Sequence, residues 1–249
     1  MSEGWNDYAE EFNDFALFDT QNIHTGLGLK GIDPNYVVKQ ADNIMDIGCG
    51  EGTNTYLMYL VAKSKTVGID IAASAINKAK RQYATDKCCF FNCDLETYLG
   101  LYDGNPFDLI TFWGSLDYLK IDSIFFESLN RITKIGSRCF ISKFHPMWTA
   151  LYGNDVDNPI MKSYFDEGRV DLIPYGSKNK VYLKRIHYPI SYIYKMFSEN
   201  GWSLSVLQEP KPSIKDASFK YKNYDSDDTL MERMSNVPMT IIFEFERGK

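Results

Sequence analysis

Short apolar runs alternate with amphipathic stretches between residues 43 and 144 of this 249-residue chain. The apolar runs have the length of buried strands, and the amphipathic stretches place apolar residues at helical spacing. Strands are predicted over 43–47, 65–70, 88–94, 107–113 and 138–144, and helices over 53–63, 72–83 and 122–136. Asp122 is the expected N-cap of the last helix and Gly136 its end. Alternating strands and helices predict a parallel, doubly wound α/β sheet.

The pattern changes on both sides of this region. Residues 5–18 carry aromatic residues at helical spacing, which predicts a helix that either packs on the body or also covers a pocket. Residues 146–188 lack the strand–helix rhythm and are rich in aromatics, so we expect an inserted cap. After a helix that ends near Gly201, strand patterns at 202–210 and 237–247 follow with only a polar loop between them. They predict an antiparallel hairpin at the edge of the sheet.

Composition limits the class of protein. Hydrophobic residues make up 44% of the chain and the net charge is −6, which favours a folded core and disfavours a nucleic-acid-binding surface. No apolar run approaches about 18 residues and the N-terminus does not resemble a signal peptide, so we expect a cytoplasmic protein with no membrane partner. The five cysteines lack metal-ligand spacing, so no metal site is predicted.

A glycine-rich stretch, residues 46–52 (Asp-Ile-Gly-Cys-Gly-Glu-Gly), overlaps the end of the first predicted strand. A phosphate-binding P-loop would need a lysine after its last glycine, but Thr53 follows here. A dinucleotide-binding turn would need Gly-x-Gly-x-x-Gly, which is one residue longer. The charges of Asp46 and Glu51 would repel a pyrophosphate. The stretch therefore favours a ligand that carries positive charge.

Residues 46–52 resemble the Asp-x-Gly-x-Gly-x-Gly signature of class I S-adenosylmethionine-dependent methyltransferases. Residues 40–144 keep that family's order of elements, and 187–202 through 237–247 resemble the final helix and hairpin of its bacterial small-molecule members. The resemblance implies a Rossmann-like, doubly wound, mostly parallel sheet with a C-terminal antiparallel hairpin and an inserted cap. It also implies S-adenosylmethionine as cofactor, whose sulfonium and ammonium groups suit the acidic turn.

One methyltransferase domain is expected over residues 1–249. Within it, we expect a helical lid over 1–30, a cofactor-binding core over 40–144 and a substrate cap inserted at 146–188.

The resemblance places the cofactor at the carboxyl ends of the first four predicted strands. Gly48 and Gly50 let the backbone approach the methionine part, Asp70 binds the ribose hydroxyls and Asp94 accepts from the adenine amino group. An aspartate after a strand is also often a helix N-cap, which is the structural alternative for Asp70. The expected cofactor-binding residues are Asp46, Gly48, Cys49, Gly50, Asp70, Ile71, Asp94, Leu95, Trp113 and Gly114.

Candidate catalytic residues lie beyond the last parallel strands. An oxygen acceptor usually needs a base, and the candidates are His145, Asp117 and Tyr118. A histidine after a strand is also often a structural residue. The expected acceptor contacts come from the lid and the cap and are Tyr8, Trp148, Tyr152 and His187. The basic residues of the cap, which form either a solvated face or a site for an anionic substrate, are Lys178, Lys180, Lys184 and Arg185.

The sequence thus predicts S-adenosylmethionine-dependent methyl transfer to an oxygen or nitrogen nucleophile of a small molecule, in a biosynthetic reaction. Two alternatives stay open. The same fold can transfer another group of the cofactor, aminocarboxypropyl or carboxymethyl, or the chain is a non-catalytic accessory subunit. A homodimer is a further expectation.

Overall fold

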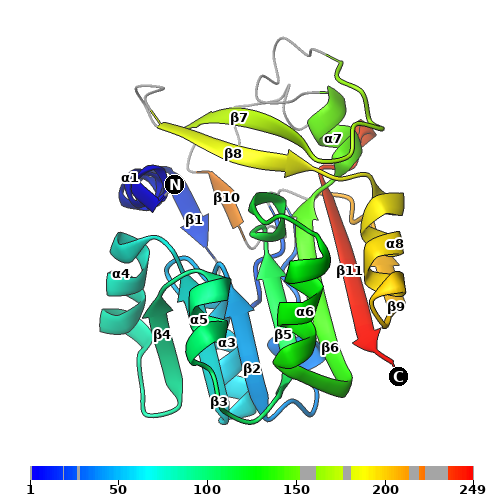
Figure 1. Cartoon of the computed structure of the whole chain (residues 1–249). Coiled ribbons are helices and arrows are strands. Elements are labelled where there is room, and N and C mark those ends of the chain that lie inside the picture. Colours follow the sequence, from blue (N-terminus) through cyan, green and yellow to red (C-terminus); the bar gives the residue numbers. More distant parts are fainter. Residues whose placement is uncertain are drawn as a thin grey trace.

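A central sheet of seven strands runs through the residues that the structure describes, which are 2–18, 20–26, 29–151, 161–175, 181–212, 219–221 and 235–248. In this computed structural model the strand order is β4–β3–β2–β5–β6–β11–β9 (Figure 1). The strands are β2 (Asn43–Ile47), β3 (Lys65–Asp70), β4 (Cys88–Asn92), β5 (Phe107–Trp113), β6 (Thr133–Phe144), β9 (Trp202–Gln208) and β11 (Thr240–Arg247). Strands β4 to β6 pair in parallel, and β11 is antiparallel to both β6 and β9.

This topology confirms the predicted mostly parallel, doubly wound sheet with an antiparallel pair at its C-terminal edge. The last strand, β11, does not form the edge itself but lies between β6 and β9. A polar connection between the two last strands is long enough to let the chain return to this inner position.

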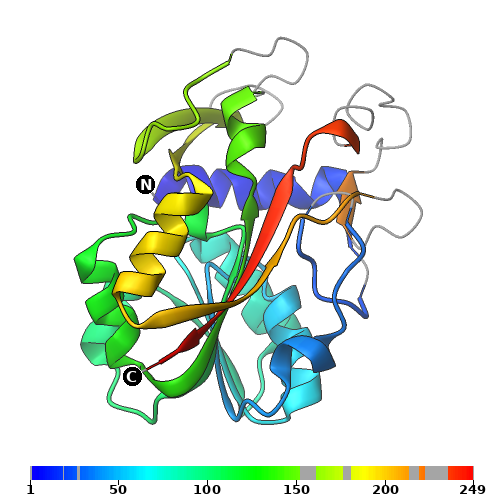
Figure 2. The same ribbon diagram turned by 90° about the vertical axis from the view of Figure 1, so that its right-hand side faces the viewer.

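Helices pack on both faces of the sheet (Figures 1 and 2). One face carries α2 (Pro34–Val38), α3 (Thr53–Ala62) and α4 (Ala73–Tyr83), and the other carries α5 (Leu95–Leu101), α6 (Ser123–Arg131) and α8 (Ile190–Glu199). Leu57 of α3 packs against one side of the strands, and Phe126 and Phe197 pack against the other. The sequence pattern did not indicate α2 and α5, because each is only about two turns or less.

The expected helix over 122–136 is right at its start and wrong at its end. Asp122 caps α6 by accepting a hydrogen bond from the Phe125 N–H at 3.1 Å. The helix ends at Arg131, and Gly136 lies inside β6 with φ = +86°. The register of the pairing between β5 and β6 shifts in this region. The positive φ of Gly136 therefore belongs to an irregularity of the strand and not to a helix end.

The N-terminal helix α1 (Ser2–Phe15) confirms most of the prediction for 5–18. Its last three expected residues instead form β1 (Ala16–Phe18), which pairs with β10 (Phe219–Tyr221). That partner lies some 200 residues away in the chain, so helical spacing alone could not reveal it. Figure 2 shows α1 crossing above the carboxyl ends of the parallel strands.

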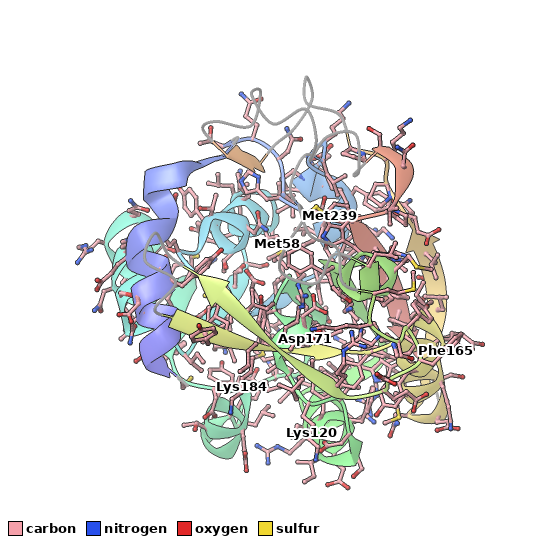
Figure 3. The ribbon with its side chains drawn as sticks, turned by 90° about the horizontal axis from the view of Figure 1, so that it is seen from above. Met58, Lys120, Phe165, Asp171, Lys184 and Met239 are labelled. Atoms are coloured by element: carbon pink, nitrogen blue, oxygen red, sulfur yellow. The ribbon has the colours of Figure 1, made fainter. Side chains whose placement is uncertain are left out.

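Between β6 and α8 the chain leaves the central sheet. It forms α7 (Pro146–Leu151) and then a hairpin of β7 (Arg169–Tyr175) and β8 (Val181–His187), which pair with each other in antiparallel fashion. The hairpin lies above the carboxyl ends of the sheet (Figure 1), and from above it crosses the middle of the molecule (Figure 3). Tyr152 lies outside the described residues. In the described part of the chain, every helix is too short or too polar to span a bilayer.

Candidate functional site

The glycine turn between β2 and α3 has one position that opens outward. Gly48, Gly50 and Gly52 all have positive φ angles, +72°, +54° and +82°. A Cβ atom on Gly48 would lie 2.3 Å from Ser115 Cβ, and one on Gly52 would lie 2.6 Å from the ring of Phe90. A Cβ on Gly50 would meet no atom within 4 Å. Packing therefore explains two glycines, whereas Gly50 leaves bare backbone facing open space where a ligand can approach.

Asp70, the last residue of β3, holds this turn in place. Its carboxylate accepts hydrogen bonds from the N–H of Gly50 at 2.9 Å and from that of Ala72 at 2.8 Å. Burial raises the pKa of Asp70, and these backbone hydrogen bonds oppose the rise. Each carboxylate oxygen has a second lone pair, so Asp70 can hold the turn and still accept from a ligand hydroxyl.

Asp46 lies beneath the turn and points into the protein. Its two oxygens accept from the hydroxyls of Thr55 at 2.6 Å and Thr111 at 2.9 Å. The side chain is fully buried, and burial raises its pKa to about 7. The thiol of Cys49 packs against Gly68, and burial also raises its pKa. Both side chains therefore support the turn from below, and Cys49 is not an activated nucleophile.

The ends of β4 and β5 border the same region. Asp94 caps α5 by accepting from the Thr97 N–H at 2.7 Å, and Leu95 begins that helix. Trp113 packs on Phe140 at 5.2 Å between ring centroids, and its buried indole Nε1–H has no hydrogen-bond acceptor among the described residues. A buried donor without an acceptor is uncommon in folded proteins.

Gly114 follows Trp113 and extends the open edge of the site. Its φ is +79°, and a Cβ there would also meet no atom within 4 Å. Its N–H donates to the carbonyl of Ser142 in β6, which fixes the loop. Ile71, on the far side of Asp70, is half-buried at the start of the loop into α4. Open backbone at Gly50 and Gly114, with Asp70 beside Gly50 and Trp113 beside Gly114, fits a ligand with hydroxyl and carboxylate groups.

Helix α1 covers this region, and the sequence pattern predicted only some of the residues that it contacts. Trp5 meets the ring of Tyr118 edge-on at 4.6 Å and that of Tyr8 at 5.6 Å. Lys78 of α4 donates to the carbonyl of Ala9 at 2.9 Å and pairs with Glu51 at 2.8 Å. The pair offsets the negative charge of the turn, a feature not foreseen from the sequence.

A second contact missed at the sequence level joins the glycine turn to the N-terminal segment. The side-chain amide of Asn54 accepts from the His24 N–H and donates to the His24 carbonyl, both at 2.9 Å. Asn54 lies two residues after Gly52, so its position next to the motif was the only available signal.

The candidate base His145 has both ring nitrogens engaged. Nδ1 accepts from the Met147 N–H at 3.0 Å, and Nε2 lies 2.7 Å from a carboxylate oxygen of Glu209. Burial lowers the pKa of His145, so the neutral ring carries its proton on Nε2 and donates it to Glu209. This arrangement leaves no free lone pair to accept a proton from a substrate.

Asp117 is likewise bound inside the protein. It pairs with Lys143 at 2.7 Å, and both side chains are only 2% exposed. Its second oxygen accepts from the Phe144 N–H at 3.0 Å. Asp117 therefore fixes the short 3-10 turn Leu116–Tyr118 against β6 and does not face an acceptor as a free base.

The cap residues His187 and Trp148 are buried. His187 contacts the Thr149 hydroxyl through Nδ1 at 2.9 Å and donates from Nε2 to the Tyr164 carbonyl at 2.8 Å. Burial lowers its pKa, so the ring is neutral. Trp148 is buried within α7. His187 thus joins the hairpin to α7 through Thr149, and direct contact of His187 and Trp148 with an acceptor stays a prediction.

Known proteins share this fold and this sequence pattern. The family model described as a methyltransferase domain matches residues 38–186. A protein from Listeria monocytogenes, classed as an S-adenosylmethionine-dependent methyltransferase, has a TM-score of 0.65 at 16% identity, covering 87% of this chain and 98% of its own. Geranyl diphosphate C-methyltransferase from Streptomyces coelicolor A3(2) has a TM-score of 0.63 at 11% identity, covering 98% and 97%. A methyltransferase from Mesorhizobium loti reaches 0.60 at 18% identity, covering 85% and 93%.

No curated protein sequence matches the chain. The family match covers more than half of the chain and includes the glycine turn, Asp70 and the open backbone at Gly114. The chain therefore belongs to the methyltransferase domain family and is an S-adenosylmethionine-dependent methyltransferase.

Proposed function

We propose that this enzyme transfers the methyl group of S-adenosylmethionine to an oxygen or nitrogen nucleophile of a small molecule. The open backbone at Gly50, held by the hydrogen bond to Asp70, is the observation that carries the proposal. The reaction is a single displacement. The nucleophile forms a bond to the methyl carbon while the bond between this carbon and the sulfur breaks. Since sulfur loses positive charge during this step, the enzyme mainly has to align the two reactants.

The cofactor roles proposed here follow the geometry of the strand ends. Asp70 accepts from the ribose hydroxyls, and Ile71 and Leu95 flank the adenine ring. Asp94 accepts from the adenine amino group with the oxygen that its cap leaves available. The backbone at Gly48, Cys49, Gly50 and Gly114 approaches the methionine part, and the Trp113 indole donates to its carboxylate. In its ionised form Asp46 favours the ammonium through its field and not by direct contact, because its oxygens are bound inside the protein.

The hydrogen-bond partners of His145 and Asp117 change the role that we propose for these two residues. We infer that both are positioning residues: Asp117 fixes the turn that carries Tyr118, and His145 fixes the start of α7. Tyr118 remains the proposed catalytic contact, since its ring lies between this turn and Trp5 of the lid. An amine acceptor that arrives deprotonated needs no further base.

The acceptor is proposed to bind between the core over 40–144, the lid over 1–30 and the cap over 146–188. Tyr8 of α1 lies close enough to Trp5 to share this boundary. The acceptor of the Streptomyces relative, geranyl diphosphate, is a small molecule, which supports a similar size class here. We further propose a cytoplasmic biosynthetic role without nucleic-acid or membrane partners. A homodimer is part of the same proposal.

Two measurements test this function. Mass spectrometry of the spent cofactor is expected to show S-adenosylhomocysteine. Methylthioadenosine would mean aminocarboxypropyl transfer, and preference for a carboxylated cofactor would mean carboxymethyl transfer. Calorimetry should show that Asp70→Ala and Gly50→Arg weaken S-adenosylhomocysteine binding strongly, and unchanged affinity in both variants would refute the site.

A further inference from the structure

Helix α1 supplies a hydrogen-bond acceptor to the first turn of α4, against which it packs (Figure 1). The side-chain oxygen of Asn6 accepts from the Ser74 N–H at 3.1 Å, and the Ser74 hydroxyl donates to the Asn6 carbonyl at 3.2 Å. Ser74 is the second residue of α4, so its N–H has no acceptor within the helix itself. Asparagine often caps such an N–H, normally from the position directly before the helix. Asn6 thus caps α4 from a different helix.

The residue that precedes α4 cannot cap the helix. This residue is Ala72, whose side chain has no acceptor, whereas Asp122 caps α6 from the same position. Ala72 instead packs with Ala75 and with Ala9 of α1. Trp5 of α1 packs against these alanines. The small side chains at the start of α4 therefore let α1 approach closely enough to provide the cap.

This contact lies next to the carboxylate that shapes the proposed cofactor site. Asp70 accepts from the N–H of Gly50 at 2.9 Å and from that of Ala72 at 2.8 Å. The Ala72 carbonyl then accepts the first hydrogen bond of α4, from the Ile76 N–H at 3.1 Å. Residues 70–76 are therefore connected by consecutive hydrogen bonds. A loss of order in the first turn of α4 would also loosen the position of Asp70.

A second contact joins α1 to the other side of the same hydrogen bond. Lys78 of α4 donates to the Ala9 carbonyl at 2.9 Å and pairs with Glu51 at 2.8 Å. Glu51 follows Gly50 directly in the glycine turn. The side chains of Lys78 and Glu51 are 24% and 20% exposed, so solvent screens this pair less than a surface pair. Helix α1 is therefore connected to both partners of the hydrogen bond between Asp70 and Gly50.

The simpler explanation is that these contacts only attach α1 to the body of the domain. In that case α1 would depend on α4, but cofactor binding would not depend on α1. A cap that stabilises the ordered start of α4, however, also stabilises the conformation in which Asp70 can bind the ribose. Thermodynamic linkage makes this effect reciprocal, so bound cofactor would strengthen the attachment of α1 by the same factor. The two explanations therefore differ in a measurable way.

We propose that Asn6 is a positioning residue for S-adenosylmethionine: it caps α4 from α1 and thereby holds Asp70 in the orientation that binds the ribose. The proposal rests on the proposed role of Asp70 and adds α1 to the cofactor site. The site is complete only when α1 is in place, and bound cofactor stabilises α1 in that place.

Calorimetry with S-adenosylhomocysteine on the full chain tests the role of Asn6. Asn6→Ala removes the acceptor and should weaken binding about threefold to fivefold, as expected for the loss of one helix cap. Asn6→Asp keeps an acceptor and places a negative charge near a helix N-terminus, so its affinity should stay within about twofold of the wild type. Asn77→Ala is the matched control, because Asn77 is exposed on the same α4 and should leave the affinity unchanged. Unchanged affinity in Asn6→Ala, or an equal loss in Asn6→Asp, would refute the proposal.

Adenosine distinguishes positioning of Asp70 from simple covering of the site. It contains the ribose and adenine of the cofactor but lacks the methionine part. If Asn6 acts through Asp70, Asn6→Ala should weaken adenosine binding, measured by ligand-detected NMR, by the same factor as S-adenosylhomocysteine binding. A loss for S-adenosylhomocysteine alone would mean that α1 covers the methionine part, and it would overturn the role of Asn6 through Asp70.

Hydrogen exchange on the wild type gives a test that needs no substitution. Because the coupling is reciprocal, S-adenosylhomocysteine should slow the exchange of amide hydrogens in α1 and in the first turn of α4 about threefold to fivefold. Unchanged exchange in α1 would contradict the proposal.

Asp70→Ala separates this proposal from the cofactor site on which it rests. Unchanged S-adenosylhomocysteine affinity in Asp70→Ala would refute the site itself. Lost affinity in Asp70→Ala together with unchanged affinity in Asn6→Ala would refute only the role of Asn6.

Discussion

The carboxylate of Asp70 accepts a hydrogen bond from the Gly50 N–H at 2.9 Å, so the end of β3 holds the glycine turn after β2. Replacing Asp70 by Asn exchanges one carboxylate oxygen for an amide nitrogen and removes the charge. Because hydrogen bonds to charged groups contribute about 1.5–3 kcal/mol, Asp70→Asn should weaken S-adenosylhomocysteine binding by about tenfold or more. Calorimetry measures this loss. Asp86→Asn, at an exposed loop position, should bind as the wild type does.

Gly48 and Gly50 should respond differently to alanine, although both have positive φ. At Gly50 the added methyl group meets no protein atom, so Gly50→Ala should lower stability by only about 1–2 kcal/mol but reduce cofactor affinity. At Gly48 the same group would lie 2.3 Å from Ser115, so Gly48→Ala should lower the melting temperature further. Thermal unfolding and calorimetry on both variants separate the two effects. Equal melting temperatures with unchanged affinity would contradict this division.

Asp46 should make stability depend on pH. Burial raises its folded pKa from the ordinary 3.8 to about 7, so the neutral form is favoured in the folded protein. The stabilising contribution is complete below pH 4 and is lost as the pH rises toward 7. Relative to Asp46→Asn, the wild type should lose about 2–3 kcal/mol of unfolding free energy between pH 5 and pH 8. Urea unfolding at several pH values measures the difference, and parallel profiles for the two proteins would contradict it.

The sequence was sufficient for the parts of the molecule that depend on local pattern. The parallel strands, the glycine turn and the cap at Asp122 follow from neighbouring residues. The environment of the candidate catalytic residues does not, because their partners are distant in the chain. Glu209 lies 64 residues from His145, and Lys143 lies 26 residues from Asp117. A histidine or aspartate at a strand end therefore looks available in the sequence, even where the fold has already bound it.

The pair of Lys143 and Asp117 gives a prediction of this long-range kind. Lys143→Met leaves the Asp117 carboxylate buried without its cation, which should lower stability by about 3–5 kcal/mol. Adding Asp117→Asn removes the uncompensated charge and keeps an oxygen for the Phe144 N–H. The double variant should therefore recover more than half of the loss. Urea unfolding of the two single variants and the double variant completes the cycle, and additive losses would show that the two residues are not coupled.

The edge-on contact between Trp5 and Tyr118 predicts that the local stability of α1 depends on the site that it covers. Trp5→Ala removes this contact but leaves the hydrogen bonds that Ser74 donates to Asn6 and Lys78 donates to Ala9. Since an aromatic pair contributes about 0.5–1.5 kcal/mol beyond its buried area, α1 should exchange its amide hydrogens faster while the sheet keeps its protection. Hydrogen exchange with and without S-adenosylhomocysteine measures this. Tyr194→Ala, an exposed aromatic on α8, should leave α1 unchanged. If Trp5→Ala also leaves the exchange of α1 unchanged, the helix is held by its polar contacts, and Trp5 does not control access to the cofactor.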